Sequence, residues 1–460
     1  MPPRLVISAP QGRSGKTIVS IGLCAALKRR GVAVQPFKKG RDYIDPSWLT
    51  AASGRDCRNL DTVLMPGEAM LASFYRACQG AGVAVIEGAM GLYDGIDASA
   101  KGSTAHVARL LTAPVILVVN AARMTNSVAA MVGGYQNFEP DTGIAGVILN
   151  NVAGSRHEQK LVTAIERHCK IPVVGCVPKD ASLSITERHL GLVPYGEGGR
   201  EEIIDRICDG TVKYLRFDDI MDIARRAGEV CLSHMPVPEH KTATVKLGVI
   251  RDNIFTFYYP DNLEALEQAG ADLVFVDSVH DRNLPDVDGL YIGGGFPELF
   301  LPELEANTGL RRSIAQAVEN GLPVYAECAG LMYLCRDIRW RSKRYEMVGA
   351  IPAEVELCQR PQGHGYVQVE VAGDNPLLPA GQTFWGHEFH HSRLLCPGGL
   401  KFAYRLTRGH GVDGRHDGIV YKNVLASYTH LHALGVPGWA DAFVSLMFRA
   451  RQRSFSIMKS

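Results

Sequence analysis

Long hydrophobic runs are missing from this sequence of 460 residues. No apolar stretch reaches the roughly 18 residues that a membrane-spanning helix needs. The chain opens with a strand pattern rather than a signal peptide. The formal net charge is only +1, and neither half is strongly basic, so an electrostatic footprint for nucleic acid is also missing. These absences predict a protein with neither membrane nor nucleic-acid partners.

A paired cysteine pattern is missing as well. The eleven cysteines are an odd number and include no Cys-x-x-Cys pair. This pattern argues against a disulfide framework and against a structural zinc site. Thiols that remain free fit a reducing compartment, so we expect a cytoplasmic protein.

The length and the hydrophobic pattern predict two α/β domains. A chain of 460 residues exceeds one ordinary core. Residues 1–195 and 244–460 each alternate short apolar runs with amphipathic stretches, which is typical of a parallel sheet covered by helices. Residues 196–243 are predicted as a helical connector and linker, with a proline-bearing polar stretch at 233–242.

Near-continuous apolar runs mark the expected strands. Beyond residue 345 the pattern shifts toward β-structure, as at Gly363–Val371, and the last helix is expected at Gly438–Arg449. The strands expected before that point are Leu5–Ala9, Val32–Phe37, Val83–Glu87, Val115–Asn120, Val147–Asn150, Lys246–Ile250, Leu273–Val276, Gly289–Ile292 and Leu322–Cys328.

A phosphate-binding loop is the clearest motif of the first domain. It lies between a predicted strand and a predicted helix, where backbone N–H groups point at phosphates. Pro10 replaces the first glycine of the usual G-x-x-x-x-G-K-[ST] pattern. Lys16 would offset the charge of the β/γ oxygens, and Thr17 would bind Mg²⁺. The alternative is a glycine-rich turn with a chance Gly-Lys-Thr. The residues expected to bind ATP here are Gly12, Ser14, Gly15, Lys16 and Thr17.

Polar residues follow three other predicted strands of this domain. Asp42 and Asp45 come after the second strand, Glu87 ends the third, and Asn150 ends the last. Ligands bind beyond the carboxyl ends of such strands. We therefore expect Asp42 and Glu87 to join Thr17 at Mg²⁺, Asp45 to face substrate or metal, and Asn150 to contact adenine. A plain turn and a solvated strand-end glutamate are the alternatives.

A single cysteine marks the second domain. Cys328 ends an apolar run in the segment Tyr325-Ala326-Glu327-Cys328-Ala329-Gly330. A strand, a tight turn and a helix form the elbow that presents a nucleophile, and a helix N-terminus favours the thiolate. A simply buried cysteine is the alternative.

Two further features of this domain could assist a thiolate. The loop Gly293–Glu298 could aim backbone N–H groups at an oxyanion, although it could also be a plain glycine turn. A thiolate also needs a base, and histidines cluster at 386–391 and at 427–432. Composition alone does not choose between the two clusters, and no complete set of metal ligands accompanies them.

Taken together, these motifs resemble the cobyrinic acid a,c-diamide synthase family over nearly the whole chain. The motifs that carry the resemblance are Gly12–Thr17, Gly40–Pro46, Glu87–Gly95, Arg188–Pro194, Gly293–Glu298, the Cys328 elbow, Gly386–His390 and Ser427–His430.

The resemblance implies a P-loop synthetase domain similar to dethiobiotin synthetase, followed by a class I-like, flavodoxin-type glutamine amidotransferase domain. By position, Cys328 looks like the glutaminase nucleophile and His430 like its partner, with oxyanion and glutamine contacts from Gly294, Gly295 and Ala329. Family members of this type lack the third, acidic member of the triad at its usual place, so none is assigned.

The resemblance further implies a carbon–nitrogen ligase that amidates peripheral carboxylates of a tetrapyrrole with ATP and glutamine, and family members often pair as dimers. Substrate contacts are expected from Lys38, Asp42, Tyr43 and Asp45. Arg41 stands where the family usually has proline, and Lys38-Lys39 is a pair more common in the related sirohaem amidases. A nickel-sirohydrochlorin amidase, cobyric acid synthase, and a P-loop ATPase switch with an inactive amidotransferase module are the other candidates.

Overall fold

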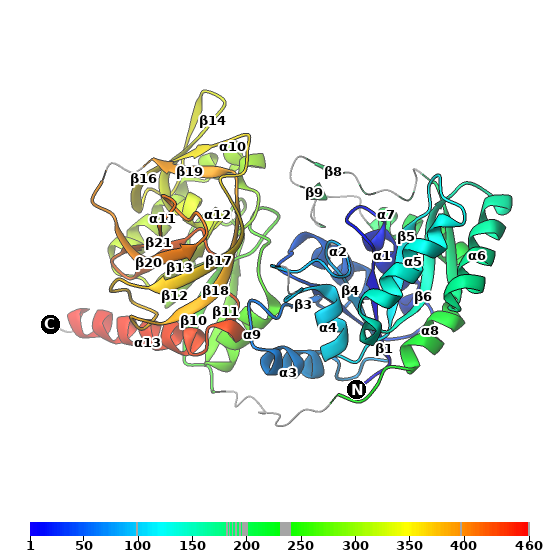
Figure 1. Cartoon of the computed structure of the whole chain (residues 1–460). Coiled ribbons are helices and arrows are strands. Elements are labelled where there is room, and N and C mark those ends of the chain that lie inside the picture. The colour runs from blue at the N-terminus through cyan, green and yellow to red at the C-terminus, as the bar shows by residue number, and fades with distance from the viewer. Residues whose placement is uncertain are drawn as a thin grey trace. The chain divides into compact units, whose positions relative to one another are not determined.

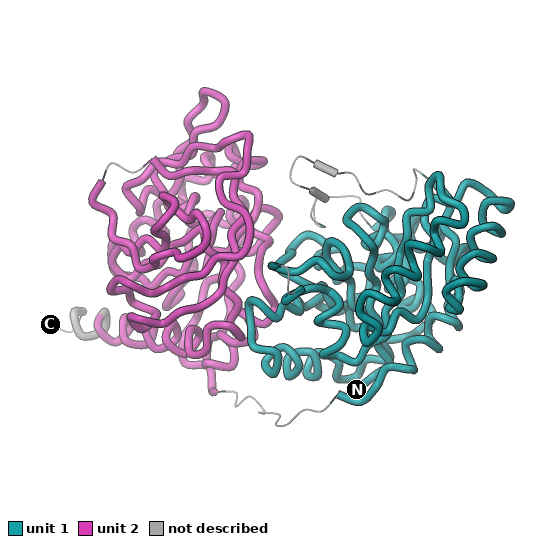
Figure 2. The backbone as a smooth tube through the Cα atoms, in the orientation of Figure 1, with its two compact units in different colours: residues 1–236 teal, residues 237–460 magenta. Residues whose placement is uncertain are grey.

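The computed structural model describes residues 1–97, 100–180, 201–230, 241–395 and 398–458, with a few positions between 183 and 195. It divides the chain into two compact units, residues 1–236 and 237–460 (Figure 2). The predicted linker 233–242 lies outside the described residues except for its last two positions. Of the motif Arg188–Pro194 the structure describes Arg188, Gly191 and Leu192, which lie in two short antiparallel strands, β8 Glu187–Arg188 and β9 Gly191–Leu192. The exact domain boundaries 1–195, 196–243 and 244–460 remain predictions.

Within the described part of the first unit, seven strands form one sheet in the order β3-β2-β4-β1-β5-β6-β7, and every pairing is parallel. All five predicted strands are present. The strands β3 and β7 were not predicted: β3 has only three residues, RNL, whereas β7, VVGCVP, is an apolar run whose signal was overlooked. The strands are β1 Arg4–Ser8, β2 Val34–Lys39, β3 Arg58–Leu60, β4 Val83–Glu87, β5 Val115–Asn120, β6 Ile144–Val152 and β7 Val173–Pro178.

Helices cover this sheet, with α4 and α5 in front of it in Figure 1. One core cluster joins the apolar sides of α1, α2, α7 and α8 to the sheet. Gly22 of α1 is required at this contact, because a Cβ atom there would lie 2.0 Å from Thr211 Oγ1 of α7. The helices are α1 Lys16–Arg29, α2 Ile44–Ser53, α3 Gly67–Ala77, α4 Thr104–Leu110, α5 Ser127–Phe138, α6 Ser155–Cys169, α7 Glu201–Tyr214 and α8 Phe217–Arg225. The predicted connector helices therefore pack as part of the first unit.

The second unit has a larger, mixed sheet. Its described residues contain nine strands in the order β11-β10-β12-β13-β22-β21-β20-β17-β18. The pairings from β11 to β22 are parallel, and those from β22 to β18 are antiparallel. These strands are β10 Val245–Ile250, β11 Ala271–Val276, β12 Gly289–Ile292, β13 Val324–Glu327, β17 Gly363–Val371, β18 Thr383–His390, β20 Lys401–Arg408, β21 His416–Tyr421 and β22 Val424–Ser427.

The second unit also departs from prediction in three places. A small sheet of β15-β14-β16-β19 was not predicted. Cys328 lies just outside β13 rather than in it, and α13 runs to Met458 instead of ending at Arg449. The remaining described strands and α-helices of this unit are β14 Cys335–Trp340, β15 Lys343–Glu346, β16 Ile351–Leu357, β19 Ser392–Leu395, α9 Pro260–Gln268, α10 Leu301–Ala306, α11 Thr308–Glu319, α12 Ala329–Leu334 and α13 Trp439–Met458.

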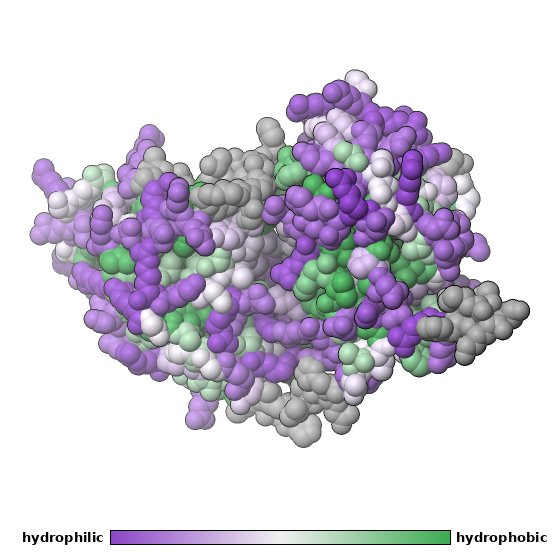
Figure 3. Space-filling view, turned by 180° about the vertical axis from the view of Figure 1, so that it is seen from behind, coloured by the Kyte–Doolittle hydropathy of each residue, from purple (hydrophilic) through white to green (hydrophobic). Residues whose placement is uncertain are grey.

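The surface is mainly polar on the face shown in Figure 3, where hydrophobic side chains form smaller patches. Among the residues described, no helix is long and apolar enough to cross a membrane. The cysteines in the described ranges are all free.

Candidate active sites

The phosphate-binding loop joins β1 to α1, and its backbone is built for that turn. Gly15 has φ +98°, a conformation that favours glycine, and a Cβ atom there would lie 2.2 Å from Asn150 Nδ2. Asn150 donates from Nδ2 to the carbonyl oxygen of Ser14 at 3.0 Å. The end of β6 therefore supports the loop directly, and the adenine contact expected of Asn150 remains a prediction.

Lys16 is the buried cation of this loop. Its ammonium donates to the carbonyl oxygens of Met90, at 2.7 Å, and Gln11, at 3.3 Å. Burial, with repulsion from Lys38, lowers the pKa of Lys16 to about 8. A negatively charged group placed on the loop would restore the full charge of Lys16, which suits a phosphate.

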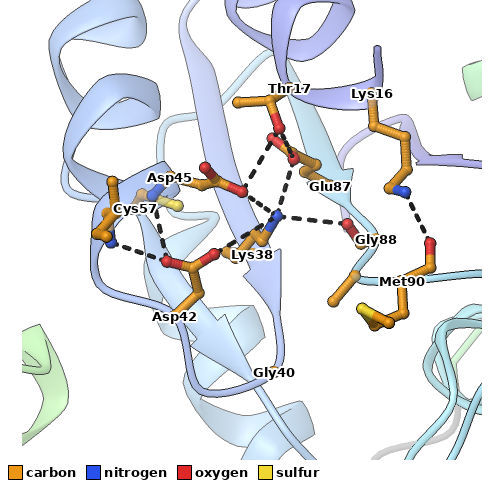
Figure 4. A network of polar contacts seen from close by, with 12 residues as sticks. Lys16, Thr17, Lys38, Gly40, Asp42, Asp45, Cys57, Glu87, Gly88 and Met90 are labelled. Carbon is orange, nitrogen blue, oxygen red and sulfur yellow. Dashed lines mark hydrogen bonds and ion pairs between the residues drawn. The ribbon is translucent and has the colours of Figure 1, made fainter. Parts of the chain in front are cut away.

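A second lysine is the centre of a charged network beside the loop (Figure 4). The Lys38 ammonium lies 2.5 Å from Asp45 Oδ2 and 2.8 Å from Glu87 Oε1. A third carboxylate, that of Asp42, lies at 3.8 Å. The register explains the meeting, because Lys38 of β2 is paired directly with Glu87 of β4. The predicted substrate residue Lys38 is therefore only 3% exposed and already paired.

The electrostatics of this network follow from burial and from Lys38. Burial opposes the charge of Lys38, but the surrounding carboxylates outweigh it and raise the Lys38 pKa well above its usual range. Burial raises the pKa of Glu87. Asp45 is buried too, yet the adjacent Lys38 lowers its pKa. Burial and the neighbouring Asp45 raise the pKa of Asp42 to about 7.

The network also contains the expected metal-binding groups. The Thr17 hydroxyl donates to Glu87 Oε1 at 2.7 Å and lies 3.4 Å from Asp45 Oδ2. Glu87 Oε2 is buried and, in the described part of the chain, has no hydrogen-bond partner. No three His, Cys, Asp or Glu side chains described here form a ready metal cage by themselves. A hydroxyl and an unsatisfied carboxylate oxygen nevertheless fit Mg²⁺, which takes most of its other ligands from phosphates and water.

The structure places the remaining predicted residues around α2. Asp42 Oδ1 accepts hydrogen bonds from the backbone N–H groups of Ile44, at 2.8 Å, and Asp45, at 3.3 Å. These bonds satisfy two N–H groups at the start of α2. Tyr43 is the residue before the first turn of α2. Asp45, rather than Asp42, approaches Thr17. A metal role for Asp42 remains a prediction.

In the second unit, Cys328 sits at a sharp turn between β13 and α12. Its backbone has φ 47° and ψ −100°, which is strained for a residue with a side chain. Its N–H donates to the carbonyl oxygen of Ser427 at 2.7 Å, which fixes the turn on β22. Gly330 lets α12 approach β12, since a Cβ atom there would lie 2.3 Å from the Ile292 oxygen. This is the geometry of a presented nucleophile.

The ionisation of Cys328 differs from the expectation drawn from the helix N-terminus. Burial, with the nearby charge of Glu298, raises the pKa of the Cys328 thiol, and the Ala329 N–H opposes this only in part. The short helix α12 does not offset burial. A thiol whose pKa is raised needs a base to become the thiolate nucleophile.

His430 follows β22 and meets a carboxylate that the sequence analysis did not assign. Its Nδ1 lies 3.2 Å from Glu327 Oε2, and the two side chains are 2% and 1% exposed. The signal in the sequence was a glutamate directly before the cysteine at the end of an apolar run. The two histidine clusters also meet here, because His387 and His430 pair through a β-bridge and their rings stack with centroids 4.8 Å apart.

The glycine loop lies against the same histidine. A Cβ atom on Gly294 would come within 2.5 Å of His430 Cε1, and one on Gly295 within 1.8 Å of the Ile254 oxygen. The Gly293 N–H donates to the Tyr258 hydroxyl at 2.7 Å, and Gly294 pairs with Phe257 through a β-bridge. The loop borders the site as expected, while the oxyanion role of Gly294, Gly295 and Ala329 remains a prediction.

Two family models match the chain, one in each unit. Residues 5–193 match the CobQ/CobB/MinD/ParA nucleotide binding domain, and residues 246–437 match the CobB/CobQ-like glutamine amidotransferase domain. The predicted fold class, a P-loop parallel-sheet domain followed by an amidotransferase domain, is confirmed. The class of protein is therefore a nucleotide-dependent glutamine amidotransferase.

Curated relatives narrow this class. The chain is 46% identical to the cobyrinate a,c-diamide synthase of Magnetococcus marinus, and the match covers 98% of both chains. It is 43% identical to that of Methanosarcina acetivorans, with 96% of this chain and 95% of the relative covered, and 44% identical to that of Archaeoglobus fulgidus, with 96% and 97% covered. The chain belongs to the cobyrinate a,c-diamide synthase family. The predicted enzyme class, an ATP-dependent ligase with glutamine as amido donor, is confirmed.

Solved structures are only distantly similar to this chain. A crystal structure of a glutamine amidotransferase covers 44% of this chain and 98% of its own at 22% identity, with a TM-score of 0.34.

Proposed function

We propose that this protein converts the a and c carboxylates of cobyrinic acid, a modified tetrapyrrole, into carboxamides. The observation that carries the proposal is the presence of two complete strand–turn–helix sites in a chain whose relatives, matched over almost their whole length, are named cobyrinate a,c-diamide synthase. One site suits phosphoryl transfer and the other suits release of ammonia from glutamine.

In the second unit, the Cys328 thiol attacks the side-chain carboxamide carbon of glutamine while His430 takes the thiol proton. The carbon–nitrogen bond breaks, His430 returns the proton to the departing ammonia, and a thioester to Cys328 remains. Water then hydrolyses the thioester and releases glutamate. Gly294, Gly295 and Ala329 are the proposed oxyanion and glutamine contacts, and one such donor is typically worth about 10²–10³ in rate.

In the first unit, a substrate carboxylate attacks the γ-phosphorus of ATP, and the bond to the β,γ-bridging oxygen breaks. This gives an acyl phosphate and ADP. Ammonia then displaces phosphate to form the carboxamide. Lys16 and the loop N–H groups would offset the charge on the transferring group. Thr17 and Glu87 would hold Mg²⁺, which would offset negative charge on the nucleotide phosphates.

The residues proposed to contact the tetrapyrrole substrate are Lys38, Asp42, Tyr43 and Asp45. Asn150 is proposed to contact the adenine of ATP. A homodimer and a cytoplasmic location are part of the same proposal, drawn from the family resemblance and from the free cysteines.

Mass spectrometry of the product tests the substrate. The full chain is incubated with ATP, Mg²⁺ and glutamine, and with cobyrinic acid or sirohaem in parallel reactions. Each carboxylate converted lowers the mass by the difference between a hydroxyl and an amino group, so the spectrum reports both substrate and count. We expect two conversions on cobyrinic acid. Conversion of sirohaem alone would overturn the proposal.

A further inference from the structure

Glu327 makes a set of contacts that a strand-end carboxylate does not need for folding alone. Its Oε2 lies 3.2 Å from His430 Nδ1, and its Oε1 accepts from the Leu431 N–H at 3.1 Å. The Tyr325 hydroxyl donates to Oε1 at 2.9 Å, and the Tyr291 hydroxyl lies 3.4 Å from Oε2. A buried carboxylate with this many donors is fully satisfied and held in one orientation.

The fold explains why a residue adjacent to the nucleophile can reach the histidine. Glu327 is the last residue of β13 and is in register with Ser427 of the neighbouring parallel strand β22. His430 follows that strand by only a few residues, so both side chains lie at the carboxyl edge of the sheet. Cys328 lies beyond the strand, at the turn with φ 47°, and its thiol donates to the carbonyl oxygen of Phe389 at 3.8 Å rather than to Glu327. The carboxylate therefore reaches the histidine without competing for the nucleophile.

The chemistry of the pair sets the state of the imidazole ring. An ionised carboxylate only accepts hydrogen bonds, so Nδ1 must carry the proton. In the neutral ring Nε2 then has a lone pair and can accept the thiol proton of Cys328. Once Nε2 is protonated, the negative charge of Glu327 stabilises the imidazolium.

We propose that Glu327 is the third member of the glutaminase site, a positioning residue that sets the tautomer of His430 and stabilises its protonated form. This inference rests on the roles proposed above for Cys328 and His430. It also gives the site an acidic residue although the family resemblance implies none at the usual place.

The test compares four full-length proteins in a glutamate-release assay with ATP, Mg²⁺ and cobyrinic acid present. They are the wild type, Cys328→Ser, Glu327→Gln and Glu370→Gln. The last is the same chemical change in a partly exposed ion pair between Glu370 of β17 and Arg405 of β20. Because the side-chain amide introduced by Glu327→Gln can donate to Nδ1, it stabilises the wrong tautomer, and kcat should fall by about 10²–10³-fold with the KM for glutamine within about two-fold. The Glu370→Gln variant should match the wild type.

A pH profile separates positioning from mere structural support. Without the carboxylate the imidazolium is less stable, so the acidic limb of kcat/KM should move to lower pH by about one unit in Glu327→Gln. Glu327→Asp, which keeps a carboxylate, should recover at least about ten-fold of the lost kcat. If Glu327→Gln does not fold, Glu327→Asp carries the test through an intermediate shift of the same limb.

Three results would overturn the inference, each recognisably. An unchanged kcat in Glu327→Gln, beside an inactive Cys328→Ser, would show that His430 needs no carboxylate. A lower kcat with an unmoved acidic limb would show a purely structural role. Continued glutamate release by Cys328→Ser would instead remove the proposed nucleophile, and this inference with it.

Discussion

The two sites share one architecture and differ in how they handle charge. Both stand at the carboxyl ends of parallel strands, at a tight turn into a helix. In the first unit, Gly15 takes up the left-handed backbone, whereas in the second Cys328 itself is held at φ 47°. In the nucleotide site, backbone N–H groups bind the phosphates, so the turn can be made by a glycine without strain. In the thiol site the side chain is the nucleophile, so the turn residue cannot be glycine and its backbone is strained.

The difference in charge follows the same division. Around Lys38, a cation and three carboxylates are already assembled and offset one another. Around Cys328, burial raises the pKa of the thiol, and the one carboxylate that we infer to assist the chemistry, that of Glu327, lies beside His430. The first site is organised to receive charged reactants, and the second to create charge only during the reaction.

The comparison predicts, first, that the glutaminase activity of the thiol site can be abolished without loss of the amidation activity of the nucleotide site. Cys328→Ser should lower glutamine-dependent amidation by at least about 10³-fold, because an alkoxide is far harder to form than a thiolate. Amidation from added ammonia should persist, as measured by product mass spectrometry with ammonium chloride in place of glutamine. Loss of both activities would mean that the two sites do not have separate roles.

A substitution in the phosphate-binding loop should abolish amidation and leave the glutaminase activity in place. Lys16→Ala removes the charge that offsets the transferring phosphoryl group, so amidation should fall by at least about 10³-fold with either nitrogen source. Glutamate release should continue, measured with the same protein and substrates. An unchanged amidation rate would exclude the loop from the reaction.

The Lys38 network should be sensitive in stability as well as activity. Lys38→Met leaves buried Glu87 and Asp45 without their cation, and such a loss typically costs about 3 kcal/mol or more. Thermal unfolding should therefore begin at a lower temperature than in the wild type. Lys28→Met, the same change at an exposed position at the end of α1, should alter the unfolding free energy by less than about 0.5 kcal/mol. Equal melting curves for the two variants would contradict the network's role.

The smallest expected effect is the uptake of a proton when nucleotide binds. Since the pKa of Lys16 is lowered to about 8 in the free protein, nucleotide phosphates should raise it and draw a proton from solution. Calorimetry of Mg-ATP binding in buffers of different ionisation enthalpy should give an uptake of roughly half a proton or more at about pH 8.5 and less at about pH 7.5. The sign follows because the free lysine is mainly neutral above its lowered pKa. An uptake independent of pH would contradict it.

Structural features that depend on residues close together in the sequence could be predicted, whereas features that depend on distant residues could not. The strand Gly363–Val371 was predicted at its observed bounds, and each predicted strand of the first unit is present, because apolar runs and flanking turns are local signals. The short strand β3 and the charged strands β14 and β15 carry weak local signals, whereas β7 is an apolar run, a clear local signal that was missed. The end of α13 was misplaced because its later turns are polar, and polarity alone does not end a helix.

The sequence by itself determined which residues can do chemistry: the Gly-Lys-Thr turn, the strand-end carboxylates and the cysteine elbow all depend on neighbours a few positions apart. Only the tertiary structure decided which of them meet. Strand order brings Lys38 beside Glu87, and the pairing of β13 with β22 brings Glu327 to His430, 103 residues further along the chain. Such contacts depend on the register of strands distant in sequence, and no local pattern of residues records that register.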